Sequence, residues 1–177
     1  MAVDIRPAVL ADAKEIASVH TRVWHATYGD MAPKEAVQTL TMTRRFADWK
    51  QTLASGDLAC KTLLAVDQNA VAGFVHYCIK NPQNIAVIKY LYIEKTWQRQ
   101  GLGQALMRRA FAGISAVGCN AAELSVVDGN TKALEFYKSL GGCVQAKLVC
   151  EGHFWRSNNR IIRWNDLKSA IITTKQV

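Results

Sequence analysis

The spacing of hydrophobic positions predicts two helical regions in the first third of the chain. Asp12 and Glu15 have the spacing of a capping box, so a helix is expected to begin there. It is expected to end near Tyr28 and Gly29. The positions that recur at helical spacing, and so share one face of this helix, are Ile16, His20, Val23, Trp24 and Thr27.

A second helical region follows Pro33 and ends at Ser55 and Gly56. Its pattern predicts two pieces, with one buried face in the second. The residues expected on that face are Met42, Phe46, Trp49 and Leu53. Residues 3–6 precede both helical regions and are expected to form a short strand that ends at Pro7.

The middle of the chain shows the signals of β structure. Residues 62–66 and 71–77 are separated by a turn at 67–69, and the pair predicts an antiparallel hairpin. A turn at 81–84 then leads into a strongly β-forming run at 86–93. Three strands in sequence are therefore expected here.

The last part alternates helices and strands. Helices are expected at 102–117 and 130–140, with a strand at 122–127 between them and two closing strands at 144–149 and 160–164. The order β-α-α-β-β-β-α-β-α-β-β predicts one α/β domain over residues 1–167. Residues 168–177 are expected to be a C-terminal tail.

Composition fits this organisation. The chain has 177 residues, of which 50% are hydrophobic, so it can bury one sizeable core. No stretch is long enough to span a bilayer, and the first residues lack the basic start and apolar block of a signal peptide. A cytoplasmic protein is expected.

The five cysteines do not follow a recognised pattern. Their number is odd, no Cys-x-x-Cys pair occurs, and the histidines lack the spacing of a zinc motif. We therefore expect small, mostly buried thiols in a reducing compartment and no bound metal. The cysteines are Cys60, Cys78, Cys119, Cys143 and Cys150.

The formal charge of +8 raises the hypothesis of a nucleic-acid-binding protein. The basic residues are spread along the chain in pairs such as Arg44-Arg45 and Arg108-Arg109, and no run of five occurs. No recognition helix, zinc finger or aromatic RNA-binding signature is present. A simpler explanation is that basic charge steers a small polyanionic ligand to the protein.

The segment Gln98-Arg99-Gln100-Gly101-Leu102-Gly103-Gln104 predicts a cradle for a diphosphate. It joins a turn with two glycines to a helix directly after the strand at 86–93. Glycines let the backbone approach an anion closely, and the first N–H groups of a helix have no partner inside it. The helix dipole adds partial positive charge there, and Arg99 adds a full charge.

Two other phosphate-binding motifs do not fit this segment. A P-loop needs a lysine and a hydroxyl residue after its second glycine, and neither follows Gly103. A dinucleotide motif needs a third glycine where Leu106 stands, and it follows its strand without the insertion Thr96-Trp97-Gln98. A tight strand-to-helix turn without a ligand remains an alternative.

With the preceding Tyr90-Leu91-Tyr92-Ile93, the segment resembles the acyl-coenzyme A signature of the GCN5-related N-acetyltransferase (GNAT) family. A second motif strengthens the resemblance. The residues from Asn130 to Gly141 are similar to the family's Asn-x-x-Ala-x-x-x-Tyr-x-x-x-Gly helix, in which Asn130 is a natural N-cap and Gly141 a natural end. The chain departs from the family at Gly142, where an aromatic residue is usual.

The resemblance implies a mixed, mainly antiparallel sheet in which the parallel strands at 86–93 and 122–127 splay apart to form a slot. Unpaired backbone in the slot, at Leu91, Tyr92 and Ile93, would bind the pantetheine arm of acetyl-CoA. The implied acyl donor is acetyl-CoA. The further residues implied in its binding are Gln98, Arg99, Gln100, Gly101, Leu102, Gly103, Gln104, Asn130 and Tyr137.

Acyl transfer to an amine determines which catalytic groups the site must contain. An alkyl ammonium, with a pKa of about 10.4, must lose a proton before it can attack. Glu94 is the first candidate base and Glu123 the second, although both could be ordinary surface carboxylates. By resemblance, Tyr137 would protonate the departing thiolate, and a backbone N–H of Tyr92 or Ile93 would stabilise the oxyanion. Direct transfer in a ternary complex is the expected mechanism.

The sequence says less about the amine acceptor than about the acyl donor. Trp24 and Tyr28 could line its site, with His25 and the segment His153-Phe154-Trp155, although Trp24 and Tyr28 could equally pack in the core. A primary amine of a small molecule or peptide is expected. Homodimers through the late strands are common for this fold. A non-catalytic acyl-CoA-binding module and a basic nucleic-acid-binding protein remain the alternatives.

Overall fold

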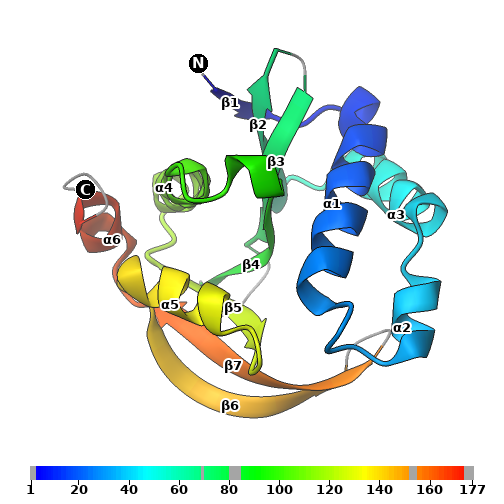
Figure 1. The fold of residues 1–177 in the computed structure, drawn as a ribbon. Helices are drawn as coiled ribbons and strands as arrows, with labels where there is room; N and C mark the ends of the chain where they lie inside the picture. Colours follow the sequence, from blue (N-terminus) through cyan, green and yellow to red (C-terminus); the bar gives the residue numbers. More distant parts are fainter. Residues whose placement is uncertain (1–2, 69, 80–84, 152–154, 174–177) are drawn as a thin grey trace.

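A computed structural model describes residues 3–68, 70–79, 85–151 and 155–173. Its centre is one seven-stranded sheet in the order β1-β2-β3-β4-β5-β7-β6 (Figure 1). Among the described strand pairs, β4 and β5 are parallel and the others are antiparallel. The strands are β1 (Asp4–Pro7), β2 (Cys60–Asp67), β3 (Ala70–Cys78), β4 (Ile85–Ile93), β5 (Ala121–Val127), β6 (Cys143–Glu151) and β7 (Arg156–Trp164).

Helices cover both faces of this sheet. In Figure 1, α1 (Ala13–Tyr28) and α3 (Met42–Ala54) lie on one side of β2 and β3, and α4 (Leu102–Ala116) lies on the other. The short α2 (Lys34–Thr39) connects α1 to α3. The remaining helices are α5 (Thr131–Ser139), α6 (Leu167–Thr173) and the 3-10 turns η1 (Leu10–Asp12) and η2 (Lys95–Trp97). The predicted single α/β domain with a mixed, mainly antiparallel sheet is confirmed.

Alternation along the strands divides the buried residues into two clusters. On β3, Phe74 packs with Ile16 and Trp49 from the helices on one face. Its neighbour Val75 packs with Leu106 and other residues on the opposite face. Successive side chains of a strand point to opposite faces, so one strand contributes to both clusters. The centre of the sheet, at β3, is therefore buried on both sides.

The structure corrects the predicted start of the first helix. The side chain of Asp12 makes no N-cap hydrogen bond to α1. Its carboxylate instead accepts hydrogen bonds from the guanidinium of Arg6 at 2.8 Å and from the backbone N–H of Val9 at 2.8 Å. The guanidinium of Arg6, the largest influence, holds the pKa of Asp12 below its ordinary value. Asp12 thus ties the helix to β1 rather than capping it.

Phe46 and the C-terminal segment also differ from expectation. Phe46 is 38% exposed, and Arg45 occupies the buried position beside it on α3. Leu167–Thr173 forms α6 in place of the start of a tail. Leu167 is fully buried with α4 residues, and its N–H donates to the carbonyl of Asn120. This helix therefore completes the core.

The departure at Gly142 has a structural reason. A Cβ built at Gly142 would lie 2.5 Å from Ile162 Cγ2 and 2.8 Å from Trp164 Cζ2. Trp164 is 2% exposed, and its indole N–H donates to the carbonyl of Leu140 at 2.9 Å. An aromatic side chain from β7 thus occupies the space that an aromatic residue after α5 would need.

Two further sequence expectations can be compared with the structure. Cys60 and Cys78 form a disulfide between β2 and β3, which corrects the expectation that all five cysteines are thiols. Cys119, Cys143 and Cys150 are free, and of these Cys119 is buried. None of the helices in the described part of the chain combines the length and apolar character needed to cross a bilayer.

Candidate active site

The predicted cradle begins with a turn that its own side chains hold in place. The side-chain amide of Gln98 donates to the carbonyl of Ile93 at 2.9 Å, and that of Gln100 donates to the carbonyl of Thr96 at 2.7 Å. Both glutamine amides therefore bind carbonyls of the turn and the end of β4. The backbone N–H of Gln98 also donates to the carbonyl of Lys95, so the start of the turn is held by backbone as well as side-chain contacts.

The backbone of this turn has an unusual conformation. Arg99 has φ 63° and Gly101 has φ 78°, while Gln100 between them keeps a negative φ. Residues that alternate between right- and left-handed conformations turn successive N–H groups toward one concave side, which favours an anion. A Cβ at Gly101 would meet nothing within 4 Å, so the space beside it is open. The turn therefore leaves open space beside its backbone at the start of α4.

Gly103 has a different role from Gly101. A Cβ at Gly103 would lie 3.2 Å from Cζ of Phe136 and 3.7 Å from Cγ1 of Ile93. The absence of a side chain lets α4 pack closely against α5 and the end of β4. Leu102 is buried beneath the same turn, while Gln104 is half-buried on the first turn of α4.

The two parallel strands splay as the resemblance implies. β4 and β5 pair at Ile85 with Ala121, at Ala86 with Ala122 and at Val87 with Glu123. The described register contains no β4–β5 pair beyond Val87. From there to Ile93, β4 pairs with β3 alone, which leaves the backbone of Leu91, Tyr92 and Ile93 without a strand on the β5 side. Such an edge can accept an extended ligand as a substitute strand.

Asn130 joins α5 to the end of α1. Its side-chain oxygen accepts from the backbone N–H of Ala133 at 3.2 Å, which confirms the predicted N-cap. Its side-chain amide donates to the hydroxyl of Tyr28 at 3.2 Å. This second contact links residues 102 positions apart and was not predicted. Asn130 therefore connects the helix predicted to bind the acyl donor with Tyr28, which was predicted to line the site of the amine acceptor.

Tyr137 lies on α5 with 9% of its surface exposed. Its ring packs against Phe136 and Trp164, with centroid distances of 5.2 and 6.0 Å. Burial raises the pKa of Tyr137 above its ordinary value, and the hydroxyl of Tyr28 adds to this shift. Burial likewise raises the pKa of Tyr28. Both phenols therefore keep their protons at neutral pH and can act as donors.

Aromatic residues from two distant segments meet beside Tyr28. Its ring centroid lies 5.7 Å from that of Trp24 and 6.3 Å from that of Trp155, which precedes β7. Trp24 is 6% exposed but belongs to neither of the two core clusters of the described residues. His25 is held through a ring nitrogen 3.0 Å from the carbonyl of Leu40. His153 and Phe154 lie outside the described residues.

The two candidate bases occupy different places. Glu94 follows β4 directly, and its carboxylate accepts a hydrogen bond from Nε of Arg22 at 2.9 Å as part of an ion pair. Glu123 pairs with Arg163, whose Nη2 lies 2.6 Å from Glu123 Oε2. Glu123 stands opposite Val87, six residues and about 20 Å before the end of β4. Of the two carboxylates, only that of Glu94 adjoins the cradle.

Comparisons with known proteins agree with this geometry. The model of the Acetyltransferase (GNAT) family matches residues 20–141. The uncharacterized N-acetyltransferase YuaI of Bacillus subtilis (strain 168) is 25% identical over 174 residues, which cover 94% of this chain and 95% of YuaI.

Solved structures share the fold. PaiA N-acetyltransferase from Thermoplasma acidophilum, in complex with coenzyme A, has a TM-score of 0.75 and 20% identity, over 92% of this chain and 98% of PaiA. YncA from Salmonella typhimurium, solved with its cofactor acetyl-CoA, has a TM-score of 0.70 and 18% identity, over 94% and 95% of the two chains. The splayed strands, the turn before α4 and the family match over residues 20–141 lead to one conclusion: the chain belongs to the acetyltransferase (GNAT) family.

Proposed function

We propose that this protein transfers the acetyl group of acetyl-CoA to a primary amine of a small molecule or peptide. The observation that carries the proposal is the junction of β4 and α4. A strand with one edge free of β5 leads there into a turn with positive φ angles at Arg99 and Gly101, directly before the start of a helix. An extended amide arm and a diphosphate are the two chemical parts that such a junction accommodates.

The residues present fit this donor. The backbone of Leu91, Tyr92 and Ile93 would hold the pantetheine arm, and the backbone from Gln98 to Gln104 would hold the diphosphate, with Arg99 adding positive charge. When bound, acetyl-CoA supplies a thioester carbonyl carbon, which is the electrophile for the amine. The open space beside Gly101 supports this assignment, because a phosphate group can come close to the backbone there.

Glu94 would take the proton that the acceptor ammonium must lose. It stands at the end of β4, where the arm of the donor would terminate, and Arg22 holds its carboxylate in place. An ion pair restricts the side chain to one orientation, which favours proton transfer to a defined position. A water molecule between the amine and Glu94 would serve equally as a relay.

Tyr137 would donate a proton to the departing thiolate. Its hydroxyl is protonated at neutral pH, as a tyrosine ordinarily is, and burial raises the pKa of Tyr137 further. A backbone N–H of Tyr92 or Ile93 would stabilise negative charge on the thioester oxygen, and a preformed donor of this kind lowers the barrier without reorganisation. The amine would attack directly, in a complex that holds both substrates. Asn130 would position Tyr28 beside this site.

Trp24, Tyr28 and Trp155 would form the wall of the acceptor site. Their rings approach one another between α1 and the start of β7, close to Asn130. The faces of aromatic rings attract ammonium groups. An amine that carries its charge next to an apolar or aromatic group is therefore the acceptor class that this wall favours.

Chromatographic detection of coenzyme A released from acetyl-CoA, across a panel of amines, peptides and polyamines, tests the proposal. We expect release that depends on one class of amine. The Glu94→Gln variant should lower kcat for that amine while acetyl-CoA still binds by calorimetry, and Glu123→Gln is the matched control. Binding without turnover of any amine would favour a non-catalytic acyl-CoA module, and absence of binding would refute both.

A further inference from the structure

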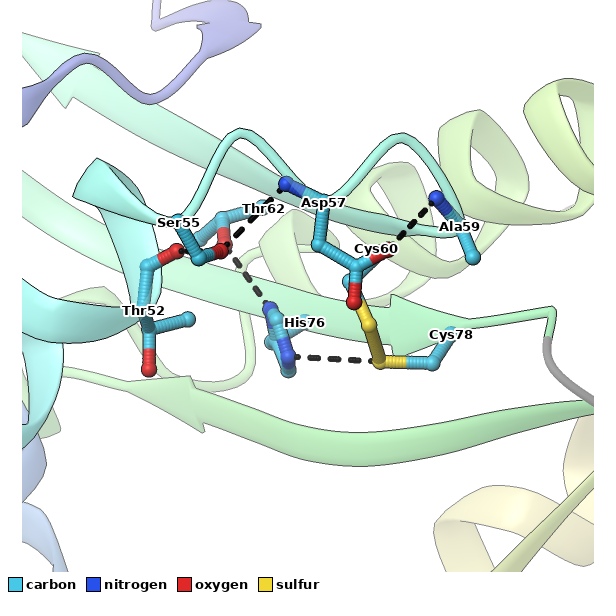
Figure 2. The surroundings of a disulfide bond; sticks show 8 residues. All are labelled: Thr52, Ser55, Asp57, Ala59, Cys60, Thr62, His76 and Cys78. Atoms are coloured by element: carbon cyan, nitrogen blue, oxygen red, sulfur yellow. Dashed lines mark hydrogen bonds between the residues drawn. A yellow bond between two sulfur atoms is a disulfide. The ribbon is translucent and has the colours of Figure 1, made fainter.

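A second group of reactive side chains lies at the end of the sheet opposite the cradle. Cys60 and Cys78 are register partners on β2 and β3, and Thr62 and His76 form a pair two residues further on. Residues two apart on a strand point to the same face, so all four side chains share one face of the hairpin. Figure 2 shows the disulfide and the His76 ring side by side between these strands.

We propose that Cys60, His76 and Cys78 form a binding site for a thiophilic divalent cation of the Zn²⁺ class, which the disulfide closes and reduction opens. Two thiolates and one imidazole are ligands that Zn²⁺ prefers. The two cysteine Sγ atoms and one ring nitrogen of His76 all lie within 4.8 Å of one another. Nothing in the proposed acetyl transfer uses these residues.

The distances suit a tetrahedral ion. With bonds of about 2.3 Å to sulfur and 2.0 Å to nitrogen, a bound Zn²⁺ places its ligand atoms roughly 3.5 Å apart. Cys78 Sγ already lies 3.6 Å from His76 Nε2. Reduction breaks the bond between the two sulfur atoms, so that they can move apart to the separation that the ion requires.

A neighbouring hydroxyl orients the His76 ring. His76 Nδ1 and Thr62 Oγ1 lie 2.8 Å apart and are hydrogen-bonded. With Nδ1–H as the donor, Nε2 presents its lone pair toward Cys78. Histidines that bind metals commonly donate their other ring N–H to an oxygen in this way, which sets both the tautomer and the ring orientation.

The site opens onto a cavity of about 1090 Å³ that these three residues line. Asp57, Lys61 and Lys89 also line it. The lysines favour the thiolate form that a metal requires, and the carboxylate of Asp57 or a water molecule could occupy the fourth position. The backbone N–H of Ala59 holds Asp57 Oδ1 at 3.0 Å. The cavity gives a cation access from solvent.

A dithiol can reduce the Cys60–Cys78 disulfide and so open the site. One thiolate of the dithiol attacks a cysteine sulfur, the Cys60–Cys78 bond breaks, and a mixed disulfide forms. The second thiolate of the dithiol then displaces that cysteine, so two electrons pass to the protein and a cyclic disulfide leaves. When the cation binds, two protons leave the two thiols and the neutral imidazole donates its lone pair.

Cobalt(II) is the probe for the test, because thiolate-to-cobalt charge transfer gives a distinctive absorption band. The full chain is reduced with dithiothreitol, desalted without oxygen and titrated with Co²⁺. We expect one Co²⁺ per chain with this band in the reduced protein and no band in the oxidised protein. A reduced protein without the band would overturn the proposal.

Variants identify the ligands. Cys60→Ser and Cys78→Ser should each abolish the band, while the double variant Cys143→Ser/Cys150→Ser should retain it. If a serine variant does not fold, His76→Gln decides: it keeps both thiols and should weaken Co²⁺ binding at least about tenfold. Unchanged affinity in His76→Gln, or a band that survives in a folded Cys60→Ser variant, would refute the site. Since cobalt binding is measured without acetyl-CoA, the result is independent of the proposed activity.

Discussion

The two ends of β4 differ in how their backbone is paired. At its start, Val87 pairs with Cys78 on β3 and with Glu123 on β5. Near its end, Leu91 pairs with Val75 on β3 and has no described partner on β5. Backbone polar groups that lack a partner need one from water or a ligand. The start of the strand is thus suited to holding the fold together, and its end to binding.

Side-chain burial follows the same division. Ala86 and Ala122 are fully buried at the paired end, and Leu167 of α6 is fully buried in the same core cluster. Leu91, Tyr92, Ile93 and Glu94 at the splayed end are each half-buried. Substitutions at the paired end should therefore change stability, whereas substitutions at the splayed end should change ligand binding or turnover.

The largest effect is expected from Leu167→Ala at the paired end. Loss of a fully buried leucine leaves a cavity and should lower the free energy of unfolding by about 2–5 kcal/mol. Urea unfolding measures this change, and calorimetry should show coenzyme A affinity unchanged under folding conditions. Lys168→Ala, on the exposed side of the same helix, should alter stability by less than about 0.5 kcal/mol. Equal effects of the two substitutions would mean that α6 does not complete the core.

Acid should destabilise the folded protein through His76, which pairs with Tyr90 between the two ends of β4. Burial, the largest cause, and the charge of Lys89 lower the pKa of His76 to about 4, against 6.5 for an exposed histidine. The unfolded chain therefore binds a proton between pH 6.5 and 4 that the folded chain does not, so stability falls as pH falls through this window. The full loss is about 3.5 kcal/mol, since the two pKa values differ by 2.5 units at about 1.4 kcal/mol per unit.

The slope of the free energy of unfolding against pH in this window distinguishes the contribution of His76 from that of other titrating groups. Above pH 6.5 this contribution is constant, and below pH 4 it adds no further loss. Burial also lowers the pKa of His20, which adds a loss of the same sign. Urea unfolding at several pH values should give a smaller slope in His76→Gln than in the wild type. Identical slopes would show that His76 titrates normally in the folded protein.

Tyr137→Phe on α5 should reduce kcat by roughly two orders of magnitude, because the departing thiolate would lose its proposed proton donor. The KM for acetyl-CoA and the melting temperature should change little, since the ring is retained. Tyr77→Phe is the matched control, because Tyr77 is also a buried tyrosine but pairs with Ile88 near the start of β4. A kcat of Tyr137→Phe equal to that of the control would remove the hydroxyl from the mechanism.

Gly101→Val should weaken coenzyme A binding by roughly tenfold or more. The cost is conformational: a β-branched residue at φ 78° is strained by about 1–3 kcal/mol, although no atom blocks a side chain there. Gly101→Asn tolerates this conformation better and should keep most of the affinity. Calorimetry with coenzyme A measures both. If both variants bind like the wild type, the turn does not hold the diphosphate.

Much of the fold could be predicted from local patterns. The predicted hairpin and the helix that follows the cradle appear as β2, β3 and α4, with bounds within a few residues. The N-cap at Asn130 was also predictable, because an asparagine before a helical pattern satisfies the helix's own N–H groups. At Asp12 the same reasoning was wrong. There, Arg6 from β1 competes for the carboxylate, and no helix pattern indicates such a contact.

The disulfide shows why register was harder to predict. A bulge between Ala65 and Val66 shifts the pairing of β2 with β3 by one residue. Without it, Cys60 would stand opposite Tyr77 instead of Cys78. One residue of slip moves every side chain to the other face, so the cysteine pair depends on a feature that hydrophobic alternation does not encode.

The sequence by itself determined which segments form helices and strands, where the glycine-bearing turn lies and which family the chain resembles. These depend on spacing, side-chain type and backbone freedom within about ten residues. The tertiary structure alone decided that Arg22 holds Glu94, that Asn130 reaches Tyr28 and that the Trp155 ring packs against that of Tyr28. Such contacts join elements far apart in the chain, and their geometry is set by how the whole sheet packs its helices.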